Sequence, residues 1–261
     1  MRNWLVLLLL FSATAVHGAA VMEGTQPWPN AIVAYHFQPE LLKVAGAAGA
    51  DCTGWSKWRV GQARKACQAM ADWQAATGVR FVADGGRLDS LYILAGNSTD
   101  ATLGHMPAFN RMEVEKGATY GAVLHEFGHV LGLMHEHQRP DRADYLTFAP
   151  FLQDDINHCG LTISAVCNDV RSAFPIRKVQ MSSPYDPCSL MHYLSNQTPR
   201  HREDPRWSQI FTLTAKGQAA MATCRTQFAK LPVWCQKPGQ KCAISQDDAA
   251  IVRRFQGLKS F

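Results

Sequence analysis

Three short segments of the chain predict β-strands, because each is rich in β-branched and aromatic residues. They span residues 30–37, 79–84 and 90–96. Between the first two, apolar residues recur with the spacing of an amphipathic helix and stop at Gly78. Residues 104–114 also have strand composition, and Pro107 favours an edge strand, since proline cannot donate to a central ladder.

Two further helices are predicted downstream. Apolar residues recur with helical spacing from Thr119 to Leu131. Residues 245–256 begin with Ser245, followed closely by two aspartates, which is the pattern of a capped helix. The region between, roughly 150–240, is rich in proline, cysteine and polar residues and predicts no regular element.

Composition describes a globular chain. Its 261 residues are 47% apolar and 18% charged, enough for one large domain or two lobes around a shared cleft. The net charge of +5 is not concentrated in any run of lysine and arginine. We therefore expect neither a nucleic-acid partner nor a polybasic membrane-binding segment.

The N-terminal stretch MRNWLVLLLLFSATAVHGAA predicts a secretory signal peptide. Arg2 precedes an apolar run, and small residues follow around Gly18. The apolar run is short for a bilayer span, although an uncleaved membrane anchor is the alternative. No other segment is apolar enough to span a membrane. We therefore expect residues 1–18 to be removed and the mature protein to be secreted to the extracellular space.

Eight cysteines in an exported chain predict up to four disulfides. Many pairings are possible, but short separations favour Cys52–Cys67, Cys159–Cys167 and Cys235–Cys242, leaving Cys188–Cys224. Metal binding is the alternative role for these cysteines. No C-x-x-C spacing occurs, which favours disulfides.

The segment HEFGHVLGLMHEH contains four of the ten histidines of the chain. His125 and His129 are four positions apart on a predicted helix, so both imidazoles project from one face and can bind one metal ion. Glu126 lies beside them without having to coordinate the metal. Gly132 is suited to end the helix in a left-handed turn, after which His135 can return to the same ion. Three imidazoles leave a fourth position open, as in a catalytic zinc site.

The alternative is that these are ordinary core or surface histidines. A chance H-E-x-x-H is a real risk in one chain, but the added requirement for Gly132 and His135 at this spacing makes coincidence rare. The remaining histidines are expected to be structural, including those close to the motif. Outside the expected signal peptide, which contains His17, they are His36, His105, His137, His158, His192 and His201.

Beyond the third histidine, the chain resembles a known family. HEFGHVLGLMHEHQRPDR is similar to the zinc signature of the metzincin metalloendopeptidases, and its continuation from Glu136 resembles the astacin branch. SLMHY, at residues 189–193, resembles the Met-turn of that branch. Residues 77–82 and 244–255 resemble family segments more loosely.

The resemblance implies an α+β, metzincin-like catalytic domain of two lobes, with a twisted, mostly parallel sheet and an active-site helix above an irregular C-terminal lobe. We expect these lobes at residues 19–137 and 138–261. The resemblance also implies that Met191 forms an apolar floor below the zinc and that Tyr193 is a weak fifth ligand that swings to bind the transition state. From the residues alone, Met191 would be a core methionine and Tyr193 a half-buried aromatic.

The implied activity is endoproteolysis that depends on one catalytic zinc ion. The implied zinc ligands are His125, His129 and His135. Glu126 is then the general base, and Tyr193 shares the charge that develops on the carbonyl oxygen. By the same resemblance, a protein or peptide substrate adds a strand to the sheet edge, which we expect within residues 104–114. We expect a monomer.

Three alternatives belong to other classes or branches. A secreted zinc-binding adhesion module without activity would typically lack the base or one ligand, and a disulfide-stapled inhibitor or toxin would not need an open metal site. Another metzincin branch is disfavoured by Glu136 and Tyr193. The chain also departs from the family: Gly78 stands where a disulfide cysteine is usual, and no pro-segment is expected after the signal peptide.

Glu136 follows a predicted zinc ligand, where an unpaired carboxylate would be costly to bury. The resemblance implies that it meets the ammonium of the mature N-terminus. We therefore expect cleavage after Gly18, so that the mature chain begins at Ala19. The alternative is cleavage after Ala20, with Glu136 paired to Arg139.

Overall fold

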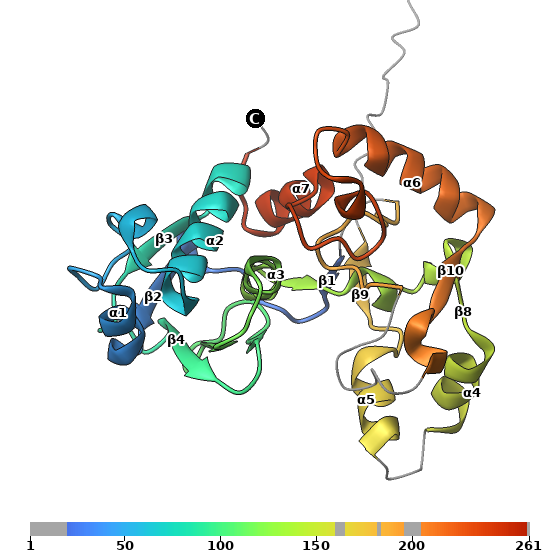
Figure 1. Cartoon of the computed structure of the whole chain (residues 1–261), viewed down its shortest axis with the longest axis horizontal. Coiled ribbons are helices and arrows are strands. Elements are labelled where there is room, and N and C mark those ends of the chain that lie inside the picture. The colour runs from blue at the N-terminus through green and yellow to red at the C-terminus, as the bar shows by residue number, and fades with distance from the viewer. Residues whose placement is uncertain (1–19, 160–164, 182–183, 196–204, 260–261) are drawn as a thin grey trace, which may run out of the picture.

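The computed structural model describes residues 20–159, 165–181, 184–195 and 205–259. The expected signal peptide, Ala19 and His201 lie outside these residues. Two bodies of secondary structure stand side by side, and helix α3 (Tyr120–Val130) lies between them (Figure 1). No helix in the described part of the chain is long and apolar enough to cross a membrane.

The first body is built on a five-stranded sheet in the order β3-β2-β4-β6-β5. Its strands are β2 (Ile32–Phe37), β3 (Arg80–Ala83), β4 (Leu91–Gly96), β5 (Asp100–Ala101) and β6 (Arg111–Glu115). Neighbouring strands from β3 to β6 are parallel, whereas β5 is antiparallel to β6. The first three predicted strands are confirmed as β2, β3 and β4.

The predicted edge strand at 104–114 is wrong in two respects. Only its last part is a strand, and this strand, β6, lies inside the sheet between β4 and β5. The residues before it form a loop around the buried Asn110 side chain, which bonds the main chain of Met106 and Asp89. Phe109 has a φ of 62°, which takes the chain out of the extended conformation. The free edge on this side of the sheet is therefore β5.

Helices α1 (Pro39–Ala45) and α2 (Gln62–Thr77) precede β3 in the chain. Helix α2 ends as predicted, because Gly78 adopts a left-handed φ of 83°. Its Trp73 is fully buried, and the indole Nε1 donates to the Leu124 carbonyl of α3 at 2.9 Å. Sheet and helices share one core, in which each buried large apolar side chain contributes about 1.5–3 kcal/mol.

The second body consists of short elements that the sequence did not predict. They are β8 (Leu146–Phe148), α4 (Pro150–His158), α5 (Ala165–Ala173), β10 (Phe211–Leu213) and α6 (Ala215–Gln227). Strands β8 and β10 pair in antiparallel fashion, and aromatic residues such as Phe174 and Trp207 form a separate core. Disulfides compensate for the short elements, and all four pairs favoured from the sequence are present.

A small sheet and a C-terminal helix join the two bodies. Strand β1 (Ala20–Met22) lies between β7 (Leu133–Met134) and β9 (Val179–Met181) and is antiparallel to both. Helix α7 (Gln246–Phe255) begins with the predicted cap, since Ser245 and Asp248 form a capping box. The expected two-lobed α+β fold with a mostly parallel sheet is confirmed.

Candidate active site

Helix α3 positions the first two histidines of the predicted site. Its first turn is capped by the Thr119 hydroxyl, which accepts from the Ala122 amide. The helix ends at Leu131, and Gly132 follows with a φ of 101°, as the sequence predicted. A Cβ atom on Gly132 would lie 2.4 Å from the Phe255 ring, so α7 packs directly against this turn. Strand β7 then leads back to His135.

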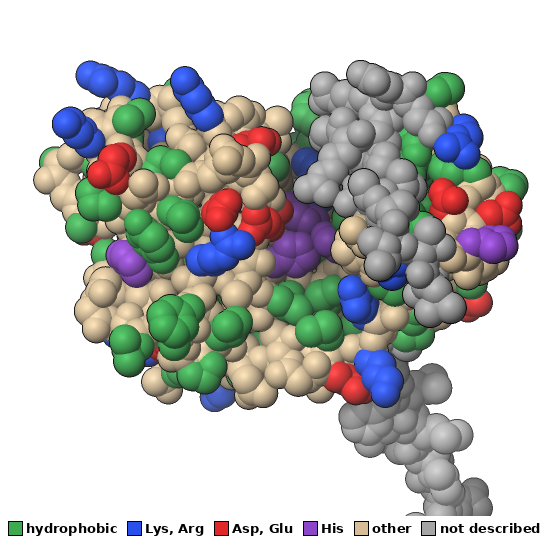
Figure 2. Space-filling view, turned by 90° about the horizontal axis from the view of Figure 1, so that it is seen from below, with side chains coloured by type: hydrophobic (Ala, Val, Ile, Leu, Met, Phe, Trp, Pro, Cys, Tyr) green, Lys and Arg blue, Asp and Glu red, His purple; other side chains and the backbone are tan. Residues whose placement is uncertain are grey.

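The three imidazoles meet in space. The Nε2 atom of His135 lies 3.2 Å from Nε2 of His125 and 3.2 Å from Nε2 of His129. Candidate donor atoms of all three residues lie within 4.8 Å of one another, and this is the only such group of histidine, cysteine or acidic side chains found among the described residues. Figure 2 shows histidine side chains at the bottom of a hollow between the two lobes.

We assign the proton of each imidazole to Nδ1, because an oxygen atom lies within hydrogen-bond distance of each Nδ1. Nδ1 of His125 donates to the Leu190 carbonyl at 2.8 Å, and Nδ1 of His129 donates to the Leu133 carbonyl at 2.7 Å. Nδ1 of His135 faces the Gln138 side-chain oxygen at 3.2 Å. Each Nε2 therefore carries a lone pair that points at the other two. Burial lowers the pKa of all three imidazoles, which keeps them neutral.

This arrangement fits a tetrahedral metal ion. Bare nitrogens cannot hydrogen-bond to one another, so three of them facing inward call for a cation. Two nitrogens at the usual zinc–nitrogen distance and the tetrahedral angle lie about 3.3 Å apart. The two measured separations of 3.2 Å agree with that value.

Glu126 places a carboxylate beside the cluster without belonging to it. The side chain is buried, and burial raises the pKa of Glu126 to about 8, partly opposed by the Lys241 ammonium. A backbone hydrogen bond with Ala101 also links this carboxylate to β5. The base predicted from the sequence thus lies next to the free edge of the sheet.

The Met191 side chain lies under α3. It is fully buried, and a Cβ atom on Gly128 would come within 2.4 Å of its sulfur. The Ser189 hydroxyl accepts from the Met191 amide and donates to Asp248 of α7, which also accepts from the Leu190 amide. The 189–191 turn is therefore bonded to α7 on one side and to His125 on the other.

The Tyr193 ring reaches the cluster from the same turn. It lies edge-on to the His135 ring at 4.7 Å and against the His137 ring at 3.9 Å between centroids. His137 is buried, and its Nε2 donates to the Ala173 carbonyl at 2.8 Å. His137 thus lines one side of the Tyr193 ring and contributes no atom to the cluster.

The other described histidines have structural partners. His192 lies 2.6 Å from the Tyr185 hydroxyl, and burial lowers its pKa to about 4. His36 bonds the Ser90 hydroxyl at 2.9 Å, and His105 pairs with Asp89 at 3.0 Å. His158 bonds a main-chain carbonyl of its own helix. None of them approaches the cluster in the described residues.

Glu136 is fully buried and forms an ion pair. Its Oε1 atom accepts from Arg139 at 3.0 Å and from the Asp186 amide at 2.7 Å, whereas Oε2 has no hydrogen-bond partner among the described residues. Burial raises the pKa of Glu136 to about 8, opposed mainly by Arg139. The Arg139 pairing weighed as an alternative is therefore present, and one carboxylate oxygen stays unsatisfied.

Two residues at the site were not predicted. Lys241 places Nζ 2.5 Å from His125 Nδ1 and 2.8 Å from the Leu190 carbonyl, and burial lowers its pKa to about 7. Gln138 supports His135 as described above. No local pattern could have found Lys241, because 116 positions separate it from His125.

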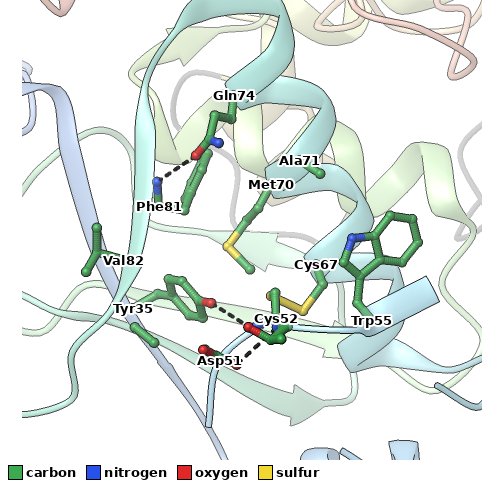
Figure 3. A pocket seen from close by; sticks show the side chains of 12 residues that line it. Tyr35, Asp51, Cys52, Trp55, Cys67, Met70, Ala71, Gln74, Phe81 and Val82 are labelled. Carbon is green, nitrogen blue, oxygen red and sulfur yellow. Dashed lines mark hydrogen bonds between the residues drawn. A yellow bond between two sulfur atoms is a disulfide. The ribbon is translucent and has the colours of Figure 1, made fainter. Parts of the chain in front are cut away.

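A separate cavity lies between α2, β3 and the loop at residues 51–55. Its volume is about 500 Å³, and its floor is formed by Met70 and the Cys52–Cys67 disulfide (Figure 3). Asp51 is the only carboxylate among its lining residues, and it accepts a hydrogen bond from the Thr53 amide. A single carboxylate is too few for a metal site built from side chains, so this cavity offers no counterpart to the three-histidine cluster.

Known proteins are similar to this chain in sequence over part of its length. The model of the peptidase family Astacin matches residues 56–252. The chain is 31% identical over 123 residues to astacin-like metalloprotease toxin 2 of Loxosceles intermedia, which covers 46% of this chain and 41% of that protein. It is 32% identical over 130 residues to the astacin-like metalloendopeptidase of Mus musculus, covering 48% of this chain and 27% of that protein. The chain therefore spans less than half the length of these relatives.

A solved structure agrees over nearly the whole chain. High choriolytic enzyme 1, a hatching enzyme zinc-protease from Oryzias latipes, superposes with a TM-score of 0.61 over 99% of both chains, at 16% identity. This likeness shows a shared fold. The family model spans the three-histidine cluster and the turn at Met191, and on that match the chain belongs to the astacin family of peptidases.

Proposed function

We propose that this chain is a secreted, zinc-dependent endopeptidase that hydrolyses internal peptide bonds of proteins or peptides. The observation that carries the proposal is the convergence of three Nε2 lone pairs beside the buried carboxylate of Glu126. The relatives support it, since their names describe a metalloprotease and a metalloendopeptidase.

One zinc ion fits the cluster by donor type and by spacing. His125, His129 and His135 would hold it through Nε2, while the oxygen partners of Nδ1 orient the rings. When bound, zinc supplies a Lewis acid that makes water nucleophilic near neutral pH. Met191 closes the site from below as an apolar floor.

Glu126 would act as the general base and then as the general acid. Its carboxylate takes the proton of the attacking water and passes that proton to the leaving amine. The Tyr193 hydroxyl donates a hydrogen bond to the carbonyl oxygen as negative charge develops there. Contact between Tyr193 and the rings of His135 and His137 supports a position for the phenol beside the reacting group.

The substrate would lie along β5 as an added strand. This strand is the free edge of the sheet next to α3, and its Ala101 bonds to Glu126. An extended peptide on this edge can form main-chain hydrogen bonds that align a peptide bond with the carboxylate. The edge strand thus replaces residues 104–114 as the proposed docking segment.

We further propose that residues 1–18 form a signal peptide, that residues 19–137 and 138–261 form the two lobes, and that the enzyme is a monomer without a nucleic-acid partner. The four disulfides support an oxidising compartment. A zinc-binding adhesion module without activity remains the rival, but it would not need a buried carboxylate beside the free edge of the sheet.

Digestion of a denatured protein mixture by the purified secreted protein tests the proposal. New N-termini should appear inside the substrate chains, and their sequences define the cleavage preference. Removal of zinc with 1,10-phenanthroline should abolish these cuts, and added zinc should restore them. No new N-termini from a zinc-loaded, folded protein would favour the adhesion module.

A further inference from the structure

One long stretch of the C-terminal lobe contains no acid. Between residues 205 and 246 there are six lysines and arginines and neither an aspartate nor a glutamate. Of these cations, Lys216 pairs with Asp144 and Lys241 is buried beside His125, so the surface charge comes from the others. The stretch includes α6, which lies along the outer edge of this lobe, and the chain that follows it (Figure 1). The sequence does not predict a basic surface here, because the lysines and arginines are separated by other residues and form no run.

Two apolar side chains project from the same stretch. Val233 is 83% exposed and Trp234 is 61% exposed, at a single helical turn spanning Val233–Cys235. The two side chains are adjacent in the chain and form one exposed apolar tip, and contiguous exposed apolar surface is a mark of contact sites. Trp234 is followed at once by Cys235, whose disulfide to Cys242 closes the loop.

The turn is rigidly held. The Cys235 amide donates to the Pro232 carbonyl at 2.8 Å, and the Gln236 side chain donates to the Leu231 carbonyl at 2.9 Å. Phe228, just before the turn, packs in a small core with the Cys188–Cys224 disulfide. Val233 and Trp234 are therefore presented outward at little further cost in conformational entropy.

Cations flank the apolar pair on both sides. Lys230 lies four positions before Trp234 and Lys237 three positions after it, with Arg225 in the last turn of α6. All three are exposed, and none forms an ion pair with an acid in the described part of the chain. The surface thus combines free positive charge with a rigid apolar tip.

We propose that this surface, defined by Arg225, Lys230, Val233, Trp234 and Lys237, docks the protein on an anionic lipid bilayer. Tryptophan favours the boundary between headgroups and acyl chains, and lysine and arginine are attracted to anionic headgroups. The apolar tip favours lipid over a sulfated polysaccharide, because a polyanion would satisfy the cations and leave Val233 in water. Nothing in this docking involves the metal site.

Vesicle co-sedimentation of the full secreted protein tests the proposal. The protein should co-sediment with vesicles of phosphatidylcholine that contain about 30% phosphatidylserine. Vesicles of phosphatidylcholine alone should bind it far less. Trp234→Ser should lower the partition constant about tenfold or more, and Lys230→Gln or Lys237→Gln about fivefold each. Raising the salt concentration should weaken the binding that depends on charge.

A matched control lies on the other lobe. Val44 is 62% exposed on α1 and adjoins the exposed Lys43, so the double variant V44S/K43Q removes a similar pair and should bind like the unchanged protein. Circular dichroism and hydrolysis of a soluble peptide should be the same for all variants. Equal sedimentation of the Trp234 variant would overturn the proposal. So would heparin binding without vesicle binding, which would identify a polyanion site instead.

Discussion

At the residue scale, the candidate site depends on the oxygen atoms that orient its three imidazoles. Oxygen partners of Nδ1 come from three separate places: the 189–191 turn, β7 and Gln138. The proposed ligands are close in sequence, which is why a local motif could predict them. Their supports are distant, and Lys241 in particular had no signal in the sequence.

Tyr193→Phe tests the role of the phenol. We propose that the hydroxyl acts mainly in the transition state, so kcat should fall about 10²–10³-fold while KM changes little. Steady-state kinetics on a fluorogenic peptide measures both constants. The control is Tyr92→Phe, which removes a hydroxyl from a tyrosine stacked on His36 in the sheet and should leave kcat unchanged. A change confined to KM would mean that Tyr193 only binds substrate.

At the element scale, long periodic segments were predictable and short irregular ones were not. Helices α2, α3 and α7 were found because each has an apolar face and a terminal signal, such as Gly78 or Ser245. The elements of the second lobe span few residues and are held by disulfides and local cores. Residues 104–110 were misassigned because strand composition does not reveal the buried Asn110 that holds them as a loop.

Gly128→Ala tests the packing of α3 on the Met191 turn. The added methyl group would lie 2.4 Å from the Met191 sulfur, so the turn must shift. We expect a loss of about 1–3 kcal/mol in the free energy of unfolding, with weaker zinc binding, measured by denaturation and by competition with a chelator. Gly117→Ala is the control, since a methyl group there meets no atom within 4 Å. Unchanged zinc affinity in Gly128→Ala would mean that the position of the Met191 turn does not affect zinc binding.

Asp89→Asn tests the link between the loop before β4 and the loop before β6. Hydrogen bonding to Arg87, together with His105, holds the pKa of Asp89 well below its ordinary value. A carboxyl whose folded pKa is lowered stabilises the protein above its unfolded pKa of about 3.9, and this contribution is lost as pH falls through the folded pKa. The variant should therefore have a lower melting temperature than the unchanged protein at about pH 7. The difference between the two melting temperatures should shrink as the pH falls below about 4. A difference in melting temperature that does not depend on pH would mean that the charge of Asp89 does not cause the stabilisation.

At the scale of the whole molecule, β1 pairs with β7, the strand that leads to His135. Ala20 is fully buried in β1 and lies opposite Met134, two residues before Glu136. The unsatisfied Oε2 of Glu136 supports the proposal that the ammonium of a mature Ala19 binds there. Removal of the signal peptide during export would then create the ammonium that joins Glu136 and Arg139 in one polar network.

The mature N-terminus is therefore the feature to vary. Glu136→Gln should destabilise by about 3–5 kcal/mol whether the partner is the ammonium or Arg139, so that variant alone does not discriminate. A two-residue N-terminal extension should destabilise only if the ammonium is buried. Intact mass of the secreted protein should show cleavage after Gly18, and a chain that begins well after Ala20 would rule the pairing out.

The central claim is that His125, His129 and His135 hold one catalytic zinc and that Glu126 performs proton transfer without holding it. The most direct measurement compares Glu126→Ala with the unchanged protein for zinc per chain and for cleavage of an internally quenched peptide. Both proteins should contain one zinc, because the ligands are intact, and only the unchanged protein should cleave, because the variant lacks the base. Substantial cleavage by a zinc-loaded Glu126→Ala protein would contradict the account.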